Sequence, residues 1–497
     1  MSFNDHLAAA RAKNRPDETQ LGALARIAID EQREDEVLPL LAIAAEGGGS
    51  AILWQWKGAL ERALDDHSEA IASFAEARRI APNDPGIAHG QARVALEAGL
   101  PAVELFERAV QLAPGDPHVY LGLNAARIAE GRAEEAEADL DHVLNRSPAW
   151  LDGHHQLAQL RSQLGRREQA FDSLQRAIAV QPEQPVLWQA MFELQILAED
   201  YPLLETSVER ARRSGVPDDL LRAYAFIAAS ELEHANVADH LVEQSGRTSI
   251  KPVWLVRHLL RSGRVMDACA LIDQQLGGPG AAEMWPYAAT AWQLSGDPRL
   301  AWLTGHQSLV STIDLGADLA RITALPDLLR RLHVVSGRYL NQSVRGGSQT
   351  DGPLLSRIDP EIRALRRLFV SAVEKHSAAL ELLPADHPQQ PPTARKRVRF
   401  AGSWSVRLTG GGFHASHVHP RGWISSALYI RLPDQLGAGE GSLALGEPPP
   451  ELRLDLPPTR VIEPKVGQLV LFPSWMWHGT RPFPEGERLT VAFDVAR

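Results

Sequence analysis

Apolar residues recur at helical spacing through the N-terminal half of the chain, and prolines interrupt the pattern at nearly regular intervals. Pro82, Pro114, Pro148 and Pro182 each follow a helical stretch, with separations of 32 (114 − 82), 34 (148 − 114) and 34 (182 − 148) residues. Proline ends a helix because it has no amide proton to donate and its ring clashes with the preceding turn. The chain is therefore expected to repeat one structural unit every 32 to 34 residues.

Small and bulky residues recur at fixed positions of this repeat. Each proline is taken as position 32 of a repeat. Small residues then occupy position 20 (Ala70, Ala136 and Ala170) and position 27 (Ala77, Ala109 and Ala177). A bulky residue occupies position 24 (Phe74, Phe106, Leu140 and Leu174). Antiparallel helices approach closely only where small side chains face each other, and a Leu or Phe fills the gap between repeats. With Trp54 and Gly58 at positions 4 and 8, residues 51–182 resemble tetratricopeptide repeats. The resemblance implies an α-solenoid.

Helical patterns continue beyond residue 182, although the period blurs. We interpret residues 183–315 as degenerate helical repeats that continue the solenoid, and residues 1–50 as a capping pair of helices that ends in the turn Gly47-Gly48-Gly49. A solenoid presents a concave surface, usually to an extended peptide or a partner protein. The alternative is a packing or dimerisation scaffold, for example in a homodimer. We favour protein or peptide binding on the analogy of the fold.

After about Asp318 the chain becomes rich in Gly, Pro and β-branched residues, which indicates a second domain. One long helix is predicted first, with Asp359 as its cap, Pro360 in its first turn and Pro384 beyond its end. Short strands follow over residues 398–408, 424–432, 442–445, 468–472 and 488–495. This order predicts a double-stranded β-helix, or jelly roll, with a flanking helix, so the fold class is an α-solenoid followed by a β domain.

Composition and charge narrow the setting of the protein. Cys269 is the only cysteine, which excludes an intrachain disulfide and a thiolate zinc site and fits a reducing, cytoplasmic compartment. The N-terminus lacks the pattern of a signal peptide, and no window of 18 uncharged apolar residues exists, so we expect no membrane insertion. A net charge of −11 gives no basic footprint for nucleic acid.

Three histidines form the candidate metal site. His417 and His419 are two residues apart, so on an extended chain they point to the same face. His478 follows a predicted strand that ends at a proline. Neutral imidazoles suit iron, zinc, copper or nickel, and three ligands leave coordination positions open for a cosubstrate and oxygen.

An arginine and a threonine begin the last predicted strand and complete the candidate site. Arg488 lies ten residues beyond His478, and Thr490 points to the same face as Arg488. A guanidinium binds a carboxylate through two parallel hydrogen bonds, and a hydroxyl can add a third donor. A dicarboxylate cosubstrate is therefore expected here, held at its far end while its 2-oxoacid end chelates the metal.

These motifs carry a resemblance to a known enzyme family. The segments 417–430 and 467–490 resemble the iron(II)- and 2-oxoglutarate-dependent oxygenases, in particular a bacterial subgroup with N-terminal tetratricopeptide repeats, and the segment Asn341 to Thr350 resembles the subgroup's approach to the domain. The resemblance covers residues 325–497. It implies iron(II) and 2-oxoglutarate as cofactors and a dioxygenase that hydroxylates a protein or peptide side chain recruited by the repeats.

The resemblance also implies roles for single residues. It implies His417 and His478 as metal ligands, Arg488 as the 2-oxoglutarate anchor with Thr490 as its helper, and no catalytic side chain beyond the metal ligands. His419 is a departure, because most of these enzymes have Asp or Glu at that position. His419 is therefore either a third ligand or lies outside the coordination sphere, with water completing the site.

Other interpretations stay open at this stage. Tyr429 either bonds 2-oxoglutarate or fills the barrel, Trp404 is expected to serve packing, and the Gly346-Gly347 turn is either a lid or a plain loop. The spacing of Gly467, Pro473 and His478 also matches a cupin motif, which would make the domain a cupin-like metalloenzyme that ignores 2-oxoglutarate. A catalytically inactive oxygenase fold that serves as a scaffold is the third alternative.

Overall fold

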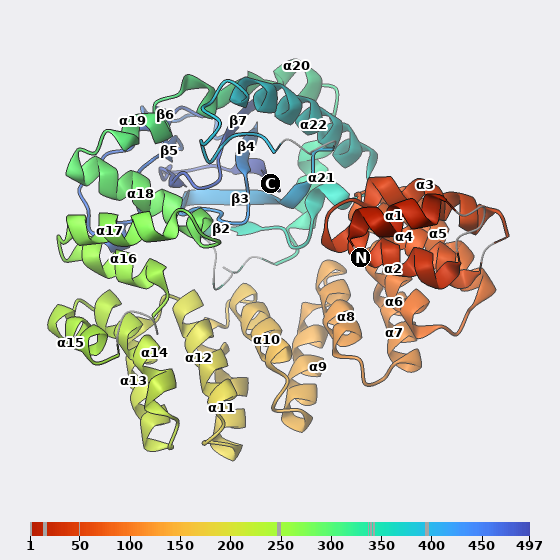
Figure 1. Cartoon of the computed structure of the whole chain (residues 1–497), viewed down its shortest axis with the longest axis horizontal. Helices are drawn as coiled ribbons and strands as arrows, with labels where there is room; N and C mark the ends of the chain where they lie inside the picture. The colour runs from red at the N-terminus through yellow and green to blue at the C-terminus, as the bar shows by residue number, and fades with distance from the viewer. Residues whose placement is uncertain are drawn as a thin grey trace. The chain divides into compact units, whose positions relative to one another are not determined.

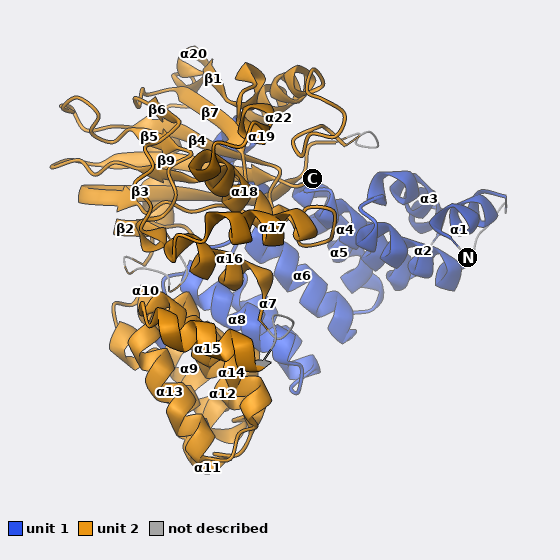
Figure 2. Cartoon of the chain, turned by 60° about the vertical axis from the view of Figure 1, so that its left-hand side comes forward, with its two compact units in different colours: residues 1–136, 351–366 blue, residues 137–350, 367–497 orange. Residues whose placement is uncertain are grey.

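The computed structural model describes residues 2–12, 17–48, 50–245, 250–335, 337, 340, 343–392 and 397–497. The chain forms two compact units, residues 1–136 with 351–366 and residues 137–350 with 367–497 (Figure 2). Gly49, Asn341 and Gln342, which the sequence-based interpretation used, lie outside the described residues. Within the described residues, no helix has the length and apolar character needed to cross a membrane.

The first unit begins with three helices, so the predicted capping pair is wrong in number. They are α1 (Phe3–Arg11), α2 (Glu18–Asp30) and α3 (Glu34–Glu46). Ser2 caps α1 by accepting the amide of Asp5, and Asp17 caps α2 by accepting the amide of Gln20. Each cap satisfies a backbone donor at a helix start and therefore fixes a separate helix beginning.

The predicted repeats are pairs of antiparallel helices. They are α4 (Ala51–Ala63), α5 (His67–Ile80), α6 (Pro85–Glu97), α7 (Val103–Leu112), α8 (Pro117–Ala129), α9 (Ala133–Arg146), α10 (Leu151–Gln163) and α11 (Asp172–Val180). Each of the four periodic prolines lies two residues beyond the end of the second helix of a pair, as their spacing predicts. The solenoid fold is therefore confirmed (Figure 1).

A close approach between neighbouring repeats depends on paired glycines and phenylalanines. A Cβ on Gly90 would lie 2.2 Å from Cε1 of Phe74, and a Cβ on Gly122 would lie 2.2 Å from Cε1 of Phe106. The later repeats carry Leu140 and Leu174 in place of the phenylalanine, and Gln156 and Ala190 then replace the glycine. The bulk of one residue thus sets the size of the residue that faces it in the next repeat.

The helical pattern continues through most of residues 183–315, as predicted. The described residues of this range form α12 (Pro185–Leu197), α13 (Tyr201–Arg213), α14 (Asp218–Glu231), α15 (Ala235–Ser245), α16 (Pro252–Arg261), α17 (Val265–Gln275), α18 (Ala281–Ser295) and α19 (Arg299–Thr304). The end of this range differs from the prediction, because Ser311–Asp314 forms strand β1 and pairs with β7. Four residues carry too short a pattern to reveal a strand, and β1 is fixed by the neighbouring strand.

The β domain consists of two antiparallel sheets. The larger has the order β1-β7-β4-β9-β3-β2, and the smaller has the order β6-β5-β8. The strands after β1 are β2 (Val344–Gln349), β3 (Phe400–His414), β4 (Ile424–Arg431), β5 (Leu443–Leu445), β6 (Arg460–Ile462), β7 (Gln468–Pro473), β8 (His478–Thr480) and β9 (Arg488–Val495). The predicted jelly-roll class is confirmed, and the five predicted strands correspond to β3, β4, β5, β7 and β9.

The glycine-rich segment is neither a lid nor a loop, unlike either prediction. Gly346 and Gly347 lie within β2, an edge strand with a register shift between Arg345 and Gly347. A Cβ on Gly347 would lie 2.4 Å from the carbonyl oxygen of Arg407 in the neighbouring strand. The glycine permits this close pairing of backbones, although glycine in a sequence usually argues against a strand.

The predicted flanking helix is α22 (Pro360–Leu380), and its C-terminal part belongs to the second unit. Phe369 meets Phe493 of the central strand β9, with ring centroids 4.5 Å apart. Helices of the repeat region also share the core of this unit, because Tyr287 of α18 meets Trp477 edge-on at 5.4 Å. One hydrophobic core therefore extends from the later repeats into the β domain.

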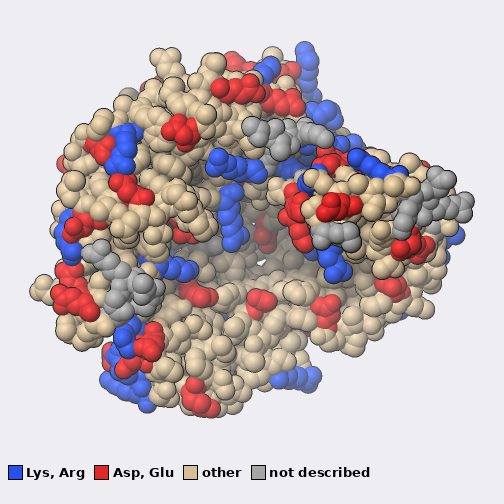
Figure 3. Space-filling model, viewed as in Figure 1, with Lys and Arg blue, Asp and Glu red and all other residues tan. Residues whose placement is uncertain are grey.

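Charged side chains are mixed on the molecular surface. On the face shown in Figure 3, acidic and basic residues are interspersed over both helices and strands. Charges of both signs at close spacing create no strong field of one sign. This face therefore offers no argument for a particular class of charged partner.

Candidate metal centre

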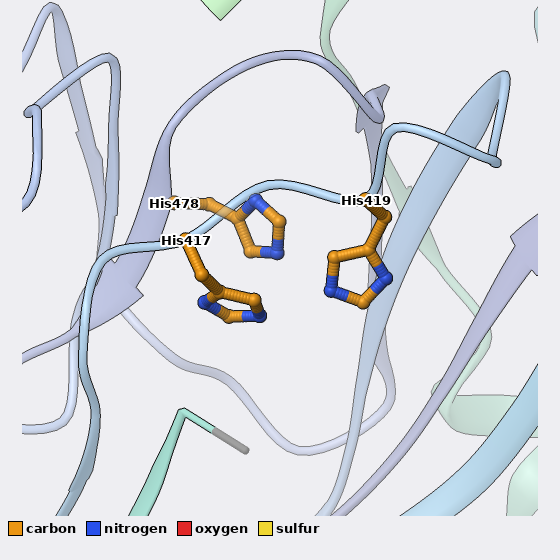
Figure 4. Close-up of side chains that lie close together, drawn as sticks. All are labelled: His417, His419 and His478. Carbon is orange, nitrogen blue, oxygen red and sulfur yellow. The ribbon is translucent and has the colours of Figure 1, made fainter. Parts of the chain in front are cut away.

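The structure brings the three predicted histidines together. His417 follows β3 and His478 begins β8, and their backbones form an antiparallel bridge with both N–H···O distances at 3.0 Å. The amide of His419 donates to the carbonyl of Ser474 at 2.9 Å. One ligand nitrogen from each ring lies within 4.8 Å of the others. Figure 4 shows these nitrogens turned toward a common space.

Hydrogen bonds at the other ring nitrogen orient each imidazole. Nδ1 of His417 lies 2.8 Å from the carbonyl oxygen of Ala415, and Nδ1 of His478 lies 2.9 Å from that of Met476. Nδ1 of His419 lies 2.5 Å from Oδ2 of Asp494. Each Nδ1 therefore carries a proton and donates it, which leaves the lone pair of Nε2 for a metal.

Burial favours the neutral form of His417 and His478. The pKa values of His417 and His478 are held well below the usual value for histidine, because burial disfavours the charged ring and the neighbouring histidines add repulsion. His414, at the end of β3, has its pKa lowered to about 3, also chiefly by burial. Neutral imidazole is the form that binds metal, so His417 and His478 can accept a divalent ion without first losing protons.

A buried guanidinium lies on the same cavity. The side chain of Arg488 is 3% exposed, and Nη1 donates to the carbonyl of Gly441 at 3.1 Å. Nε of Arg488 and the hydroxyl of Tyr429 have no hydrogen-bond partner among the described residues. The guanidinium carbon lies 5.1 Å from the centre of the Tyr429 ring. A buried cation without a carboxylate is costly, and an anionic ligand in the cavity could offset that cost.

The histidines and Arg488 line one cavity of about 660 Å³. One face of β9 contributes every second residue to its wall, namely Arg488, Thr490, Ala492 and Asp494. Tyr429 lies behind Arg488 rather than on the wall, whereas Glu283 of α18 contributes to the wall from the repeat region. Strand alternation thus places Arg488 and Thr490 together, as predicted.

Sequence reasoning missed several residues of this cavity. Oγ of Ser343 lies 3.2 Å from Nε2 of His417 and 3.1 Å from Nδ1 of His414. The ring of Trp404, expected to serve packing alone, is stacked on His419 with centroids 5.4 Å apart. Asp494 could have been found from the sequence. Side chains at every second position of a strand point to the same face, so Arg488 and Thr490 share their face with Asp494, four residues beyond Thr490. Ser343 and His414 offered no comparable signal.

Comparisons with known proteins agree with these observations. Residues 402–494 match a protein family described as "Putative 2OG-Fe(II) oxygenase", and residues 151–184 match a tetratricopeptide repeat family. Residues 402–494 are therefore similar to the 2OG-Fe(II) oxygenase domains of that family. The cofactors of this family are iron(II) and 2-oxoglutarate, and three convergent imidazoles beside an arginine whose Nε has no partner among the described residues fit both. No curated protein sequence matches the chain.

Solved structures resemble parts of the chain. A collagen prolyl hydroxylase of Paramecium Bursaria Chlorella virus-1 is 14% identical, with a TM-score of 0.26 over 38% of this chain and 95% of that chain. A Pseudomonas putida prolyl-4-hydroxylase is 18% identical, with a TM-score of 0.26 over 38% and 92%. The tetratricopeptide repeat protein YrrB is 20% identical, with a TM-score of 0.29 over 37% and 97%. Likenesses at this level say nothing about the substrate.

Proposed function

We propose that the chain is an iron(II)- and 2-oxoglutarate-dependent dioxygenase that hydroxylates a side chain of a protein or peptide recruited by its repeats. The proposal assigns the oxygenase domain to residues 325–497. The observation that carries it is the presence, on one cavity wall, of three convergent imidazoles and a buried arginine that has no carboxylate partner among the described residues.

His417, His419 and His478 would hold the iron. Their Nδ1 atoms are engaged by acceptors, so each Nε2 would be the atom that binds the metal, and one ligand nitrogen from each ring lies within 4.8 Å of the others. Three protein ligands leave positions on an iron centre for a chelating cosubstrate and for oxygen. His419 is placed here as a third ligand because its ring faces the same space as the other two (Figure 4).

Arg488 would anchor the far carboxylate of 2-oxoglutarate. Its planar guanidinium can donate two parallel hydrogen bonds to a carboxylate, and Thr490 on the same face of β9 can add a hydroxyl donor. The unpartnered hydroxyl of Tyr429 offers a further donor beside the guanidinium. Burial of Arg488 lowers its pKa but leaves it charged at neutral pH, and the bound carboxylate would compensate that charge.

Bound iron with 2-oxoglutarate would supply the oxidation. Oxidation of 2-oxoglutarate gives carbon dioxide and succinate, which takes up one atom of the oxygen molecule, and the other atom is inserted into a C–H bond of the substrate. The protein orients the reactants and keeps water away. Phe472 and Leu443 form apolar parts of the cavity wall near the histidines. A cavity of about 660 Å³ leaves room for a substrate side chain beside a five-carbon dicarboxylate.

The repeats support a protein or peptide as the substrate. Tetratricopeptide repeats support protein–protein interaction. The repeat region also contributes directly to the cavity, because Glu283 at the start of α18 belongs to its wall. A substrate that reaches the metal would therefore contact both the β domain and a helix of the repeat region.

Succinate formation tests the enzyme proposal. The full-length protein, loaded anaerobically with iron(II) and then given 2-oxoglutarate and oxygen, should produce succinate slowly even without substrate. His478→Ala should abolish this turnover, whereas His142→Ala, at an exposed histidine of α9, should retain it. A protein that binds iron and yields no succinate would instead fit the cupin-like alternative, and one that binds neither would fit the scaffold.

Mass spectrometry of captured partners tests the substrate class. The His478→Ala protein serves as bait, and each captured protein is then incubated with active enzyme, iron(II), 2-oxoglutarate and oxygen. A gain of one oxygen atom on a side chain, absent when 2-oxoglutarate is omitted, is the expected result. Turnover of 2-oxoglutarate that is stimulated only by small molecules would contradict a protein substrate.

A further inference from the structure

Asp494 lies directly behind His419 and is held there from two sides. Its Oδ2 accepts a hydrogen bond from Nδ1 of His419 at 2.5 Å, and its Oδ1 accepts one from Oγ of Ser425 at 2.6 Å. Oγ of Ser425 also lies 2.9 Å from Oγ of Ser474. Asp494 is 8% exposed. Burial and these two hydrogen bonds therefore hold the carboxylate in one position.

Only one of the three imidazoles has a charged residue behind it. Nδ1 of His417 and Nδ1 of His478 face the neutral carbonyl oxygens of Ala415 and Met476. Three neutral ligands bring no charge to offset a divalent ion, whereas oxygen-activating iron(II) centres commonly combine two histidines with one carboxylate. Asp494 places a negative charge at this centre, but behind His419 rather than in direct contact with the metal position.

Neighbouring residues preserve this pair. The ring of Trp404 is stacked on His419 at an interplanar angle of 21°. A Cβ on Gly422 would lie 2.5 Å from Oγ of Ser474 and 3.2 Å from Cβ of Asp494. Any side chain at residue 422 would therefore displace the groups that hold the carboxylate. The structure thus restrains both the ring and its acceptor.

We propose that Asp494 is a positioning residue of the metal centre, which acts through His419. It fixes the ring with Nε2 facing His417 and His478, and it supplies the negative charge that the three imidazoles lack. Carboxylates that accept a hydrogen bond from a ligating histidine raise the basicity of the ligand, and their loss weakens metal binding by about 10- to 100-fold. This inference rests on the proposed three-histidine metal site.

Metal affinity of the full-length protein tests the role of the charge. Cobalt(II) and, without oxygen, iron(II) are titrated in competition with a chelator. Asp494→Asn keeps the shape and an acceptor oxygen but removes the charge, and we expect it to weaken binding by about 10-fold or more. The visible absorption of bound cobalt should also change, because the ligand strength of His419 changes. Asp434→Asn, at an exposed aspartate of the same domain, should leave both unchanged.

A second background shows whether Asp494 acts through His419. In His419→Asp protein, two carboxylates lie side by side and repel each other, so Asp494→Asn should strengthen cobalt binding instead of weakening it. A loss by the same factor in both backgrounds would mean that Asp494 acts on the fold, and it would overturn the proposal. The absence of any loss in the wild-type background would overturn it as well.

His478→Ala separates this inference from the metal site on which it rests. If His478→Ala binds cobalt as tightly as the wild type, the three-histidine site itself is wrong, and the inference falls with it. If His478→Ala loses cobalt while Asp494→Asn binds normally, the metal site stands and only the role of Asp494 is wrong. Loss in both variants, with reversal in the His419→Asp background, supports both.

Discussion

The indole N–H of Trp477 donates to Oγ1 of Thr290 at 3.1 Å, and the carbonyl oxygen of Pro286 lies 3.2 Å from the same nitrogen. Trp477 is buried and immediately precedes His478. Thr290 and Pro286 belong to α18, in the repeat region. A helix of the repeat region thus holds the residue next to a proposed metal ligand.

Removing the indole should therefore affect both stability and the metal site. Trp477→Phe deletes the N–H donor. Oγ1 of Thr290 loses this partner, while the carbonyl of Pro286 keeps the hydrogen bond that Oγ1 of Thr290 donates at 2.9 Å, and we expect the change to destabilise the fold by about 1–3 kcal/mol. In Thr290→Val the indole N–H of Trp477 keeps the carbonyl of Pro286 as its acceptor, so the loss of stability should be smaller, about 1 kcal/mol. Urea unfolding measures both. Cobalt titration should show several-fold weaker binding for Trp477→Phe, and affinity like that of the wild type for Thr290→Val. Equal cobalt affinity in the wild type and both variants would refute the link to His478.

Arg488→Met should have opposite effects on the free protein and on cosubstrate binding. It removes a buried cation that lacks a carboxylate partner in the described part of the chain, so the protein without 2-oxoglutarate should become more stable or stay unchanged. The stabilisation that added 2-oxoglutarate gives should disappear, because the anchor is gone. Thermal unfolding with and without 2-oxoglutarate in the presence of cobalt measures both effects.

A matched arginine and a conservative change make this test specific. Arg431→Ala, at an exposed residue at the end of β4, should leave the response to 2-oxoglutarate intact. Arg488→Lys keeps the charge but loses the planar pair of donors, so its response should be intermediate. An undiminished response in Arg488→Met would remove Arg488 from the cosubstrate site.

Gly90→Ala should destabilise the first unit. The new methyl group would lie 2.2 Å from the ring of Phe74, and overpacking of this kind costs about 1–3 kcal/mol. Gly86→Ala changes a glycine of the same helix. Apart from the capping residue Asp84, the new methyl group would meet only the flexible end of Gln55, at 3.0 Å, so this change should be nearly neutral. Unfolding monitored by circular dichroism measures the difference.

A compensating change identifies the cause of that effect. Phe74→Leu combined with Gly90→Ala reproduces the smaller pair, Leu and Ala, that the chain itself uses at Leu174 and Ala190. Because the leucine leaves space for the methyl group, the double variant should regain part of the lost stability. A double variant that is less stable than the sum of the two single changes predicts would contradict the packing explanation.

His376 should make the stability of the protein depend on pH. Burial lowers its pKa to about 4, while Nδ1 lies 2.7 Å from Oγ of Ser311. The unfolded chain, with a pKa of about 6.5, binds more protons between pH 6.5 and pH 4, so the free energy of unfolding falls as the pH falls through this range. The loss from this residue should reach about 2 kcal/mol at pH 5 relative to pH 7.5.

His376→Gln isolates this contribution from those of other buried histidines. The amide does not titrate, so the difference in unfolding free energy between pH 7.5 and pH 5 should be smaller in the variant than in the wild type. Urea unfolding at both pH values gives the two differences. An identical pH dependence in the variant would show that His376 is already charged in the folded protein at pH 5.

The two halves of the chain differed in how far sequence reasoning could reach. The solenoid was predictable because its contacts are local: Pro82 ends a helix by its own chemistry, and Phe74 needs only the glycine 16 residues later, Gly90. The number of N-terminal helices was missed because α3 begins without a side-chain cap, just after Gln32 with its φ of 55°, so no characteristic residue type marks its start. Strand β1 was missed because its formation depends on pairing with β7, more than 150 residues away.

The sequence by itself determined the candidate ligands and the anchor, since the spacing of His417 and His419 and the alternation of Arg488 and Thr490 follow from an extended backbone. Only the tertiary structure decided what stands behind them. The carboxylate of Asp494 reaches His419 across 75 residues of chain because β4 and β9 are neighbours in one sheet. Trp477 reaches α18 because the repeats and the sheets share a core. Such contacts depend on how distant segments pack, and no local pattern of residues encodes them.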